Sequence, residues 1–351
     1  MLKDILGHNR EKEALLSAFR KGRLAHGYIF NGPSGTGKFA LALEFAKYIN
    51  CEESGQDACG KCTGCLQLSE NKHPDLMIVQ PVKATIKIEQ IREAKNRMAF
   101  KASFCKYKVL IINEAEKLGN NAADSLLKLL EEPSGNTLII LITSNLHSIQ
   151  DTLRSRSQVL NFSTLSAEDT TALLKVRLQL DPAKLEFLSN MAEGRPGEAI
   201  KFYEEELFEL REEVFLMTEA LLKKSLLINT KDLAGKYGKF KAEETLDQDT
   251  EDASQEGDKE DATKAQKALY VREHFINILV SIYRDIVSVK LNLAGGLVNT
   301  DKRRTVAAFA ERYTAESAAE ILQGLNRIRA LLKHYINFDL AANDLLLRGG
   351  F

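Results

Sequence analysis

The chain has 351 residues, of which 44% are apolar, so it can bury more than one hydrophobic core, and its length favours two or three domains. Its 48 basic and 49 acidic residues leave a formal net charge of -1, which excludes a global electrostatic attraction to nucleic acid. The start "MLKDILGHNR" lacks an apolar signal-peptide core, and no window approaches about 18 uncharged apolar residues. We therefore expect a cytoplasmic chain without a membrane span.

The first part of the chain alternates predicted helices and strands. In chain order, hydrophobic periodicity predicts helix 8–22, strand 26–30, helix 39–50, strand 75–81, helix 87–100, strand 107–116, helix 120–133 and strand 136–145. Apolar strands that alternate with helices indicate a parallel sheet covered on both faces. The predicted class is therefore α/β for this part of the chain.

From about residue 164 onward no further strand is predicted. Residues 166–180 and 181–203 have helical patterns, with "GRPG" as a break in the second, and the sequence from about 205 reads as long helices. The segment 242–265 contains many acids and one Leu, so we expect a disordered loop there that acts as a solvated tether.

The segment "NGPSGTGKFA" comes close to the phosphate-binding pattern G-x-x-x-x-G-K-[ST]. Gly32, Gly37 and Lys38 meet the pattern, and Gly35 lies inside the same loop. The next position should carry a hydroxyl that binds magnesium, but the chain has Phe39. The loop amides and Lys38 could still hold a phosphate, so ATP binding stays open.

A second part of the metal site is altered at the end of the strand "VLIIN". Asn113 and Glu114 stand where a Walker B strand has an Asp that holds Mg²⁺ and a Glu that orients the attacking water. Because Phe39 and Asn113 each remove a part of the magnesium site, we expect neither bound Mg²⁺ nor efficient hydrolysis. Asn145, at the end of strand 136–145, is assigned to the same degenerate nucleotide-binding site.

An arginine follows this strand in "TLRSRSQ". Ser155, Arg156 and Ser157 come soon after Asn145, and an arginine on the rim of a nucleotide domain can reach a phosphate bound by a neighbouring subunit. Such a finger is typically worth about 10³ to 10⁵ in rate. A damaged nucleotide site together with an intact finger favours a subunit that donates Arg156 to a neighbouring site. The alternative is that Arg154 and Arg156 are ordinary surface cations.

Four cysteines fall within fifteen residues. Cys51, Cys59, Cys62 and Cys65 have the spacing C-x7-C-x2-C-x2-C, and in a reducing cytosol this spacing suits a tetrahedral structural zinc. The alternative is two adventitious pairs of surface thiols. The fifth, Cys105, precedes an apolar strand and is expected to be a small buried or half-buried hydrophobe.

The predicted helix 87–100 and its flanks carry a run of cations. Two interpretations are open for it, a solvated helix face or, together with the zinc module, a DNA-binding surface. The five residues are Lys87, Arg92, Lys95, Arg97 and Lys101.

These motifs together resemble a known family. The glycine loop, the four cysteines, "HPDL", the altered Walker B strand, "SLLKLLEEP", "LIILITSN" and "RSRSQ" occur in an order similar to that of the bacterial clamp-loader ATPases of DNA polymerase III, in the AAA+ superfamily. The resemblance is strong over 1–163, moderate over 164–204 and weak beyond. Among these subunits, a damaged site with a retained finger resembles the delta-prime type and not the gamma/tau motor.

The resemblance implies a fold and roles for single residues. It implies an AAA+ α/β domain over 1–163 with the zinc module at 51–65, a small helical lid over 164–204 and an all-α collar over 205–351. The family's Ser-Arg-Cys finger is carried by the triplet around Arg156, with Ser157 in place of Cys. Gly197 stands where the family has a nucleotide-sensing arginine, and Arg195 lies two positions away.

The resemblance also implies partners and a function. The chain would be a largely non-hydrolysing stator in a hetero-pentamer with gamma/tau and delta subunits, acting with the sliding clamp and primed DNA in replication. It would not be an enzyme by itself but a component of the DNA polymerase III holoenzyme. Two alternatives stay open: an active ATPase of the gamma/tau type, and a zinc-containing DNA-binding adaptor.

Overall fold

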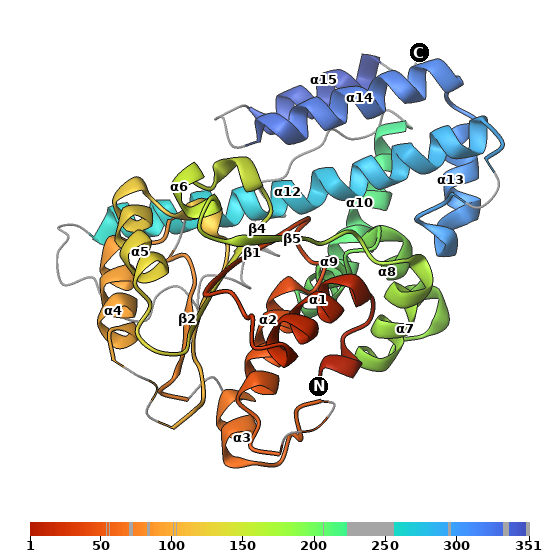
Figure 1. Ribbon diagram of the computed structural model, residues 1–351. Helices are drawn as coiled ribbons and strands as arrows, with labels where there is room; N and C mark the ends of the chain where they lie inside the picture. The colour runs from red at the N-terminus through yellow and green to blue at the C-terminus, as the bar shows by residue number, and fades with distance from the viewer. Residues whose placement is uncertain are drawn as a thin grey trace. The chain divides into compact units, whose positions relative to one another are not determined.

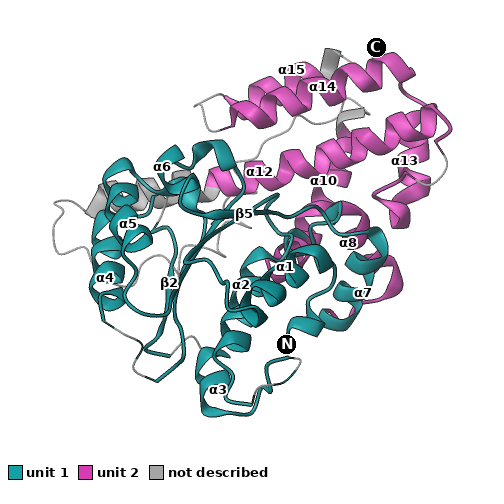
Figure 2. Cartoon of the chain, in the orientation of Figure 1, with its two compact units in different colours: residues 1–177, 192–198 teal, residues 178–191, 199–351 magenta. Residues whose placement is uncertain are grey.

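The computed structural model divides the chain into two compact units. One unit comprises residues 1–177 and 192–198, and the other comprises residues 178–191 and 199–351 (Figure 2). The three-domain division proposed from the sequence stays a prediction. The structure describes residues 1–53, 55, 57–69, 73–82, 85–100, 102, 104–205, 207–222, 256–293, 296–332 and 337–348.

The first unit contains a five-stranded sheet in which every pair of neighbouring strands is parallel. The strand order is β2-β3-β4-β1-β5, so β1 lies between β4 and β5. The predicted parallel sheet is therefore confirmed. The strands are β1 (Gly27–Asn31), β2 (Leu76–Val79), β3 (Lys108–Ile112), β4 (Thr137–Thr143) and β5 (Gln158–Asn161).

Helices cover both faces of this sheet (Figure 1). On one face, Leu15 of α1 and Phe45 of α2 pack with Phe30 and Ile140 in one buried cluster. The unit's helices are α1 (Asn9–Arg20), α2 (Lys38–Ile49), α3 (Thr63–Ser69), α4 (Ile88–Met98), α5 (Asn120–Glu131), α6 (Asp151–Arg154) and α7 (Ala167–Arg177).

A second buried cluster lies on the other face of the sheet. Ile91 of α4 and Leu126 of α5 pack there with Ile29 and Ile139 of the central strands. Because neighbouring residues of one strand point to opposite faces, Ile29 and Phe30 serve different clusters. Burying each such side chain stabilises the fold by about 1.5–3 kcal/mol.

The sequence reasoning missed the strand β5 and the short helices α3 and α6. β5 has only one buried residue, Leu160, so its apolar signal is short, and it pairs at the edge of the sheet with β1. α3 begins inside the cysteine segment, where glycines and polar residues obscure a helical period. The "GRPG" break is observed: Glu193 and Gly194 have φ values of 49° and 77°, and Pro196 begins α9.

The second unit is helical in its described part. Its longest helix, α12, begins at Glu256, so the expected loop is wrong at 256–265; its earlier residues lie outside the described ranges. Glu, Lys, Ala and Gln are abundant in this stretch and are good helix formers despite their polarity. The described helices of this unit are α8 (Pro182–Ala192), α9 (Pro196–Glu204, shared between the units), α10 (Leu207–Leu222), α12 (Glu256–Lys290), α13 (Arg303–Ala310), α14 (Ala315–Leu331) and α15 (Phe338–Arg348).

Candidate functional site

The phosphate loop joins the end of β1 to the start of α2. Gly32, Gly35 and Gly37 have φ values of 152°, 78° and 94°, which L side chains rarely adopt. A Cβ added to Gly32 would also lie 2.2 Å from the carbonyl oxygen of Phe162. The local backbone therefore explains these glycines, whereas binding of a phosphate by the loop stays a prediction.

Lys38, the first residue of α2, is folded back onto the loop. Its Nζ donates to the carbonyl oxygens of Gly32 and Pro33, at 2.6 Å each, and the residue is only 6% exposed. Burial lowers the pKa of Lys38 to about 8, and the carboxylate of Glu116 acts in the opposite direction. The cation predicted to hold a phosphate thus donates its hydrogen bonds to loop carbonyls in this structure.

The two altered metal positions lie beside the loop and at the end of β3. Phe39 packs against the buried cluster that contains Phe30. Asn113 directly follows β3, and its neighbour Glu114 has a φ of 51° and pairs with Lys117 Nζ at 2.5 Å. The structure thus has an apolar ring and a neutral amide at the two positions that the sequence analysis assigned to a magnesium site.

The sequence reasoning missed one carboxylate at this edge of the sheet. Glu116 lies in the short helix η2 (Ala115–Lys117), and its Oε1 accepts from the N–H of Ser144 at 3.2 Å and from its hydroxyl at 2.5 Å. Burial raises the pKa of Glu116, but hydrogen bonds, above all from Ser144, hold it below its ordinary value. The only signal was an acid four residues after the strand ends.

Asn145 has a local role in the described structure. Its side-chain oxygen accepts from the N–H of His147 at 3.1 Å and so caps the short helix η3 (Leu146–Ser148). This contact does not test the predicted place of Asn145 in a nucleotide site.

The "GRPG" turn packs directly on the phosphate loop. The N–H of Gly197 donates to the carbonyl oxygen of Gly35 at 2.8 Å, and a Cβ on Gly197 would lie 2.8 Å from Gly35 Cα. Only glycine fits this contact without a shift of the backbone. Arg195 lies near Glu193, with Nη2 3.9 Å from a carboxylate oxygen.

Arg156 lies in the turn after α6 and is held by three acceptors. Its Nη2 lies 2.6 Å from Glu131 Oε1, and its Nη1 donates to the carbonyl oxygen of Thr152 and the hydroxyl of Ser155. The side chain is 39% exposed. By contrast, Arg154 forms an ordinary i,i+3 pair with Asp151.

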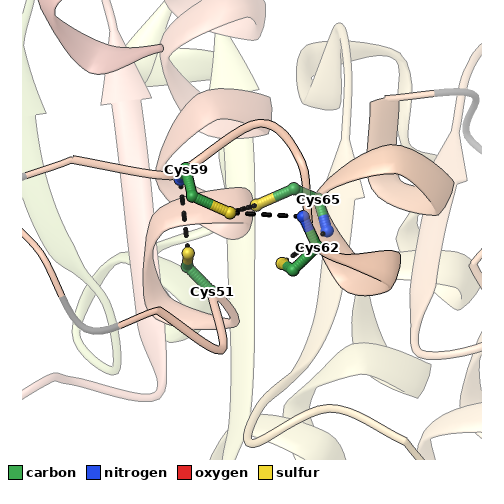
Figure 3. A group of neighbouring side chains, drawn as sticks. All are labelled: Cys51, Cys59, Cys62 and Cys65. Carbon is green, nitrogen blue, oxygen red and sulfur yellow. Dashed lines mark hydrogen bonds between the residues drawn. The ribbon is translucent and has the colours of Figure 1, made fainter.

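The four clustered cysteines converge on one point (Figure 3). Their sulfur atoms lie within 4.8 Å of one another, and those of Cys59 and Cys65 are 4.0 Å apart. Tetrahedral zinc with S–Zn bonds of about 2.3 Å requires sulfur atoms about 3.8 Å apart. The residues therefore fit a zinc ion closely.

Backbone N–H groups also point at these sulfur atoms. The N–H groups of Lys61 and Cys62 donate to Cys59 and lower the pKa of its thiol to about 7, whereas burial raises the pKa of Cys51 and Cys65. N–H groups that face a sulfur stabilise the thiolate form, which is the form that binds a metal.

A second group has side chains that could bind a metal, but their hydrogen bonds already occupy the lone pairs. The group consists of His73, Asp75 and Cys105. The N–H of Asp75 donates to His73 Nδ1 at 3.0 Å, so the neutral ring carries its proton on Nε2. That nitrogen lies 3.2 Å from Cys105 Sγ and has no lone pair for a metal. Because Asp75 Oδ2 accepts from the N–H groups of Phe104 and Cys105, the "HPD" segment fixes the loop before β3.

The cations of the α4 region are mostly solvated. Lys87, Arg92 and Arg97 are exposed and Lys95 is half-buried, while Lys101 lies outside the described ranges. Arg97 pairs with Glu93 one turn before it. No helix in the described part of the chain has both the length and the apolar character needed to cross a bilayer.

Known proteins resemble the chain along almost its whole length. A family described as "DNA polymerase III, delta subunit" matches residues 7–166, and "DNA polymerase III, delta subunit, C terminal" matches residues 252–349. The DNA polymerase III subunit delta' of Bacillus subtilis is 28% identical over 339 residues, which cover 96% of this chain and 94% of that protein. The subunit delta' of Pseudomonas aeruginosa is 32% identical over 206 residues, which cover 58% of this chain and 63% of that protein.

A solved structure also matches, that of a DNA polymerase III gamma subunit-related protein from Thermotoga maritima. It is 19% identical with a TM-score of 0.48, and the match covers 95% of this chain and 98% of that one. The parallel α/β sheet and the helical C-terminal region agree with the AAA+ fold class predicted from the sequence. From the two family matches and the delta' relatives, this chain belongs to the delta-prime type of DNA polymerase III clamp-loader subunits.

Proposed function

We propose that this subunit does not turn over ATP efficiently itself and that it donates Arg156 to ATP bound by a neighbouring subunit during clamp loading in DNA replication. The observation that carries the proposal is an asymmetry. Phe39 and Asn113 occupy the magnesium positions, while Arg156 is exposed and held in a defined geometry.

The proposed lack of efficient ATP hydrolysis by this subunit follows from the chemistry of phosphoryl transfer. Magnesium bridges the β- and γ-phosphate oxygens and neutralises charge that develops in the transition state. A phenyl ring cannot donate an oxygen ligand, and the amide of Asn113 lacks the charge of a carboxylate. The pairing of Glu114 with Lys117 occupies the carboxylate that would orient a water. Each change alone weakens hydrolysis, and together they support a subunit that is not an enzyme by itself.

The finger role follows from the guanidinium of Arg156. Its planar fork of N–H donors matches the oxygen atoms of a phosphate and keeps its charge at every physiological pH. Exposure at 39% leaves it accessible to a second chain, and the altered metal positions argue against a role in cis. The damaged site and the intact finger together support a stator that activates its neighbour.

The four cysteines are proposed to hold one structural zinc ion. Bound zinc would cross-link the chain after α2 to the first turn of α3, because Cys51 follows α2 and Cys65 lies on α3. Four sulfur ligands leave no open coordination position, so the site would stabilise structure and not bind substrate.

The proposed partners are other clamp-loader subunits of the gamma/tau and delta types in a hetero-pentamer, with the sliding clamp and primed DNA bound through the complex. The tau and gamma relatives of the chain support this choice of partners. We further propose the lid over 164–204 and the collar over 205–351, with the collar helices carrying assembly.

Arg156→Ala tests the proposal in a complex reconstituted with motor subunits, clamp and primed DNA. We expect the clamp-stimulated ATPase rate to fall while gel filtration shows normal assembly, because an exposed arginine adds little to assembly. The largest expected loss of ATP hydrolysis rate at the affected interface is about 10³- to 10⁵-fold. Arg154→Ala, which removes the same charge two residues away, is the matched control and should keep the normal rate. A normal rate for Arg156→Ala would make Arg156 a surface cation.

A further inference from the structure

Glu131 is the last residue of α5 and forms the ion pair with Arg156. Its Oε1 lies 2.6 Å from Arg156 Nη2, and the two side chains are 45% and 39% exposed. An ion pair this exposed contributes little to folding stability because water screens it. Its geometry therefore matters more for where the guanidinium lies than for how stable the fold is.

The other contacts of Arg156 fix the same guanidinium from a second side. Nη1 donates to the carbonyl oxygen of Thr152 at 3.1 Å and to Ser155 Oγ at 3.3 Å. An arginine has five N–H donors, of which these two hydrogen bonds use the Nη1 donors. Nε–H and the Nη2 group, which pairs with Glu131, are the donors from which a bidentate contact with one phosphate group could be made.

The backbone under this arrangement is closely packed. A Cβ on Gly27, at the start of β1, would lie 2.6 Å from Leu130 Cδ2 and 3.2 Å from the carbonyl oxygen of Arg156. The end of α5 and the turn that carries Arg156 thus meet over the same glycine. This packing fixes the separation of Glu131 and Arg156, so the ion pair does not depend on a mobile loop.

We propose that Glu131 is a positioning residue for Arg156. It holds one side of the guanidinium, so that the remaining donors face the γ-phosphate of a nucleoside triphosphate bound by the adjacent subunit. This inference rests on the proposed function of Arg156 in trans. A preoriented arginine does not lose side-chain freedom when the phosphate arrives, and this advantage is removed with the carboxylate.

A double-mutant cycle tests this role in the reconstituted complex with clamp and primed DNA. We expect Glu131→Ala to lower kcat of the stimulated ATPase by about tenfold, within the range of coupling between contacting residues. The KM for ATP should stay unchanged, because the nucleotide is bound by the other subunit. Glu131→Gln keeps an acceptor oxygen and should give an intermediate rate. In the Arg156→Ala background, Glu131→Ala should cause no further loss.

The neighbouring Glu132→Ala is the matched control, since it removes the same charge, is exposed, and forms no ion pair with Arg156 in the described structure. It should keep the normal rate. If Arg156→Ala lowers the rate but Glu131→Ala does not, or if Glu131→Ala causes an equal loss without Arg156, Glu131 does not position the finger. If Arg156→Ala itself has no effect, the proposed function fails, and the role of Glu131 fails with it.

Discussion

At the scale of single residues, burial lowers the pKa of Lys38, and the nearby carboxylate of Glu116 opposes part of this effect. Glu116 is half-buried, accepts hydrogen bonds from Ser144 and is not part of the phosphate-loop pattern. Lys38 and Glu116 thus place opposite charges near each other at this edge of the sheet. This arrangement is testable by substitutions that restore or remove one charge.

Phe39→Ser with Asn113→Asp restores the two missing side chains. We expect Mg²⁺-dependent nucleotide binding to increase, measured by calorimetry, while turnover stays far below that of a working ATPase. The reason is that the resemblance puts the sensing arginine at Gly197, which packs on Gly35 so that a larger side chain would require a backbone shift. Strong ATP hydrolysis by the unsubstituted chain would contradict the interpretation of the two positions.

Glu116 should make the stability of the chain sensitive to acid. Its folded pKa lies below the ordinary value of 4.5, so the charged carboxylate stabilises the fold above that pH, and the contribution is lost as pH falls through the folded value. Urea unfolding of the wild type should therefore weaken more than that of Glu116→Gln on acidification below about pH 4.5. Parallel pH curves for the two proteins would show that the hydrogen bonds of Ser144 do not favour the charged form.

At the scale of elements, the cysteine module is a short loop and helix with a small core of its own, formed by Cys51, Ala58 and Cys65. Asp57 ties the N-terminus to it by accepting from the N–H groups of Leu2 and Lys3, both at 3.0 Å. Leu68 of α3 also packs in the main core, but the cysteine loop itself has few apolar contacts. A structural zinc supplies about 10 to 16 kcal/mol of apparent binding energy in small modules.

We therefore expect one zinc per chain by elemental analysis after native purification. Chelation should increase hydrogen exchange over residues 51–53 and 57–69 and at Leu2 and Lys3, while the central strand β4 stays protected because most of its core comes from elements outside the module. Cys62→Ser should reproduce the effect of chelation. A protein purified without zinc and with the same exchange pattern would refute the zinc assignment.

In the second unit, a buried arginine connects α10 with the short helix η4 (Thr300–Lys302). Arg211 is 2% exposed, donates to both carboxylate oxygens of Asp301 and to Asn299 Oδ1, and stacks 3.9 Å from the ring of Phe187. Asp285 of α12 accepts from the backbone N–H and the side chain of Asn299 and extends this network.

Arg211→Ala should lower the free energy of unfolding by about 3–5 kcal/mol, because it leaves buried acceptors without their donor. Lys302→Ala removes a half-buried cation that pairs with the exposed Glu212, and it should cost less than about 1 kcal/mol. If the two substitutions lowered the free energy of unfolding in urea equally, burial of Arg211 would not explain its contribution to stability.

At the scale of the whole molecule, the sequence predicted the parallel sheet because its central strands are continuous apolar runs with helices between them. It also brought the phosphate loop, the altered Walker B strand and the four cysteines to attention, since each follows a short local pattern. β5 was not predicted, because this edge strand has only one buried residue and therefore a weak hydrophobic pattern. Glu116 was not predicted, because it belongs to no motif and its role depends on side chains that are distant in the sequence.

Contacts between distant segments account for the other differences. Nothing in the local sequence shows that Gly197 packs on Gly35 or that Glu131 reaches Arg156, because both contacts depend on how the sheet brings loops together. The start of α12 at Glu256 shows that an acidic, polar composition does not exclude a helix when its residues have high helix propensity.

The stimulated ATPase rate of complexes carrying either Glu114→Gln or Arg156→Ala tests the central claim most directly. The sequence analysis assigns Glu114 to the position that orients the attacking water, so under the proposal it matters only if this subunit hydrolyses ATP itself, whereas Arg156 matters only if it acts on a neighbour. The account predicts a normal rate for Glu114→Gln and a large loss for Arg156→Ala, with both complexes intact by gel filtration. A loss for Glu114→Gln with a normal rate for Arg156→Ala would contradict it.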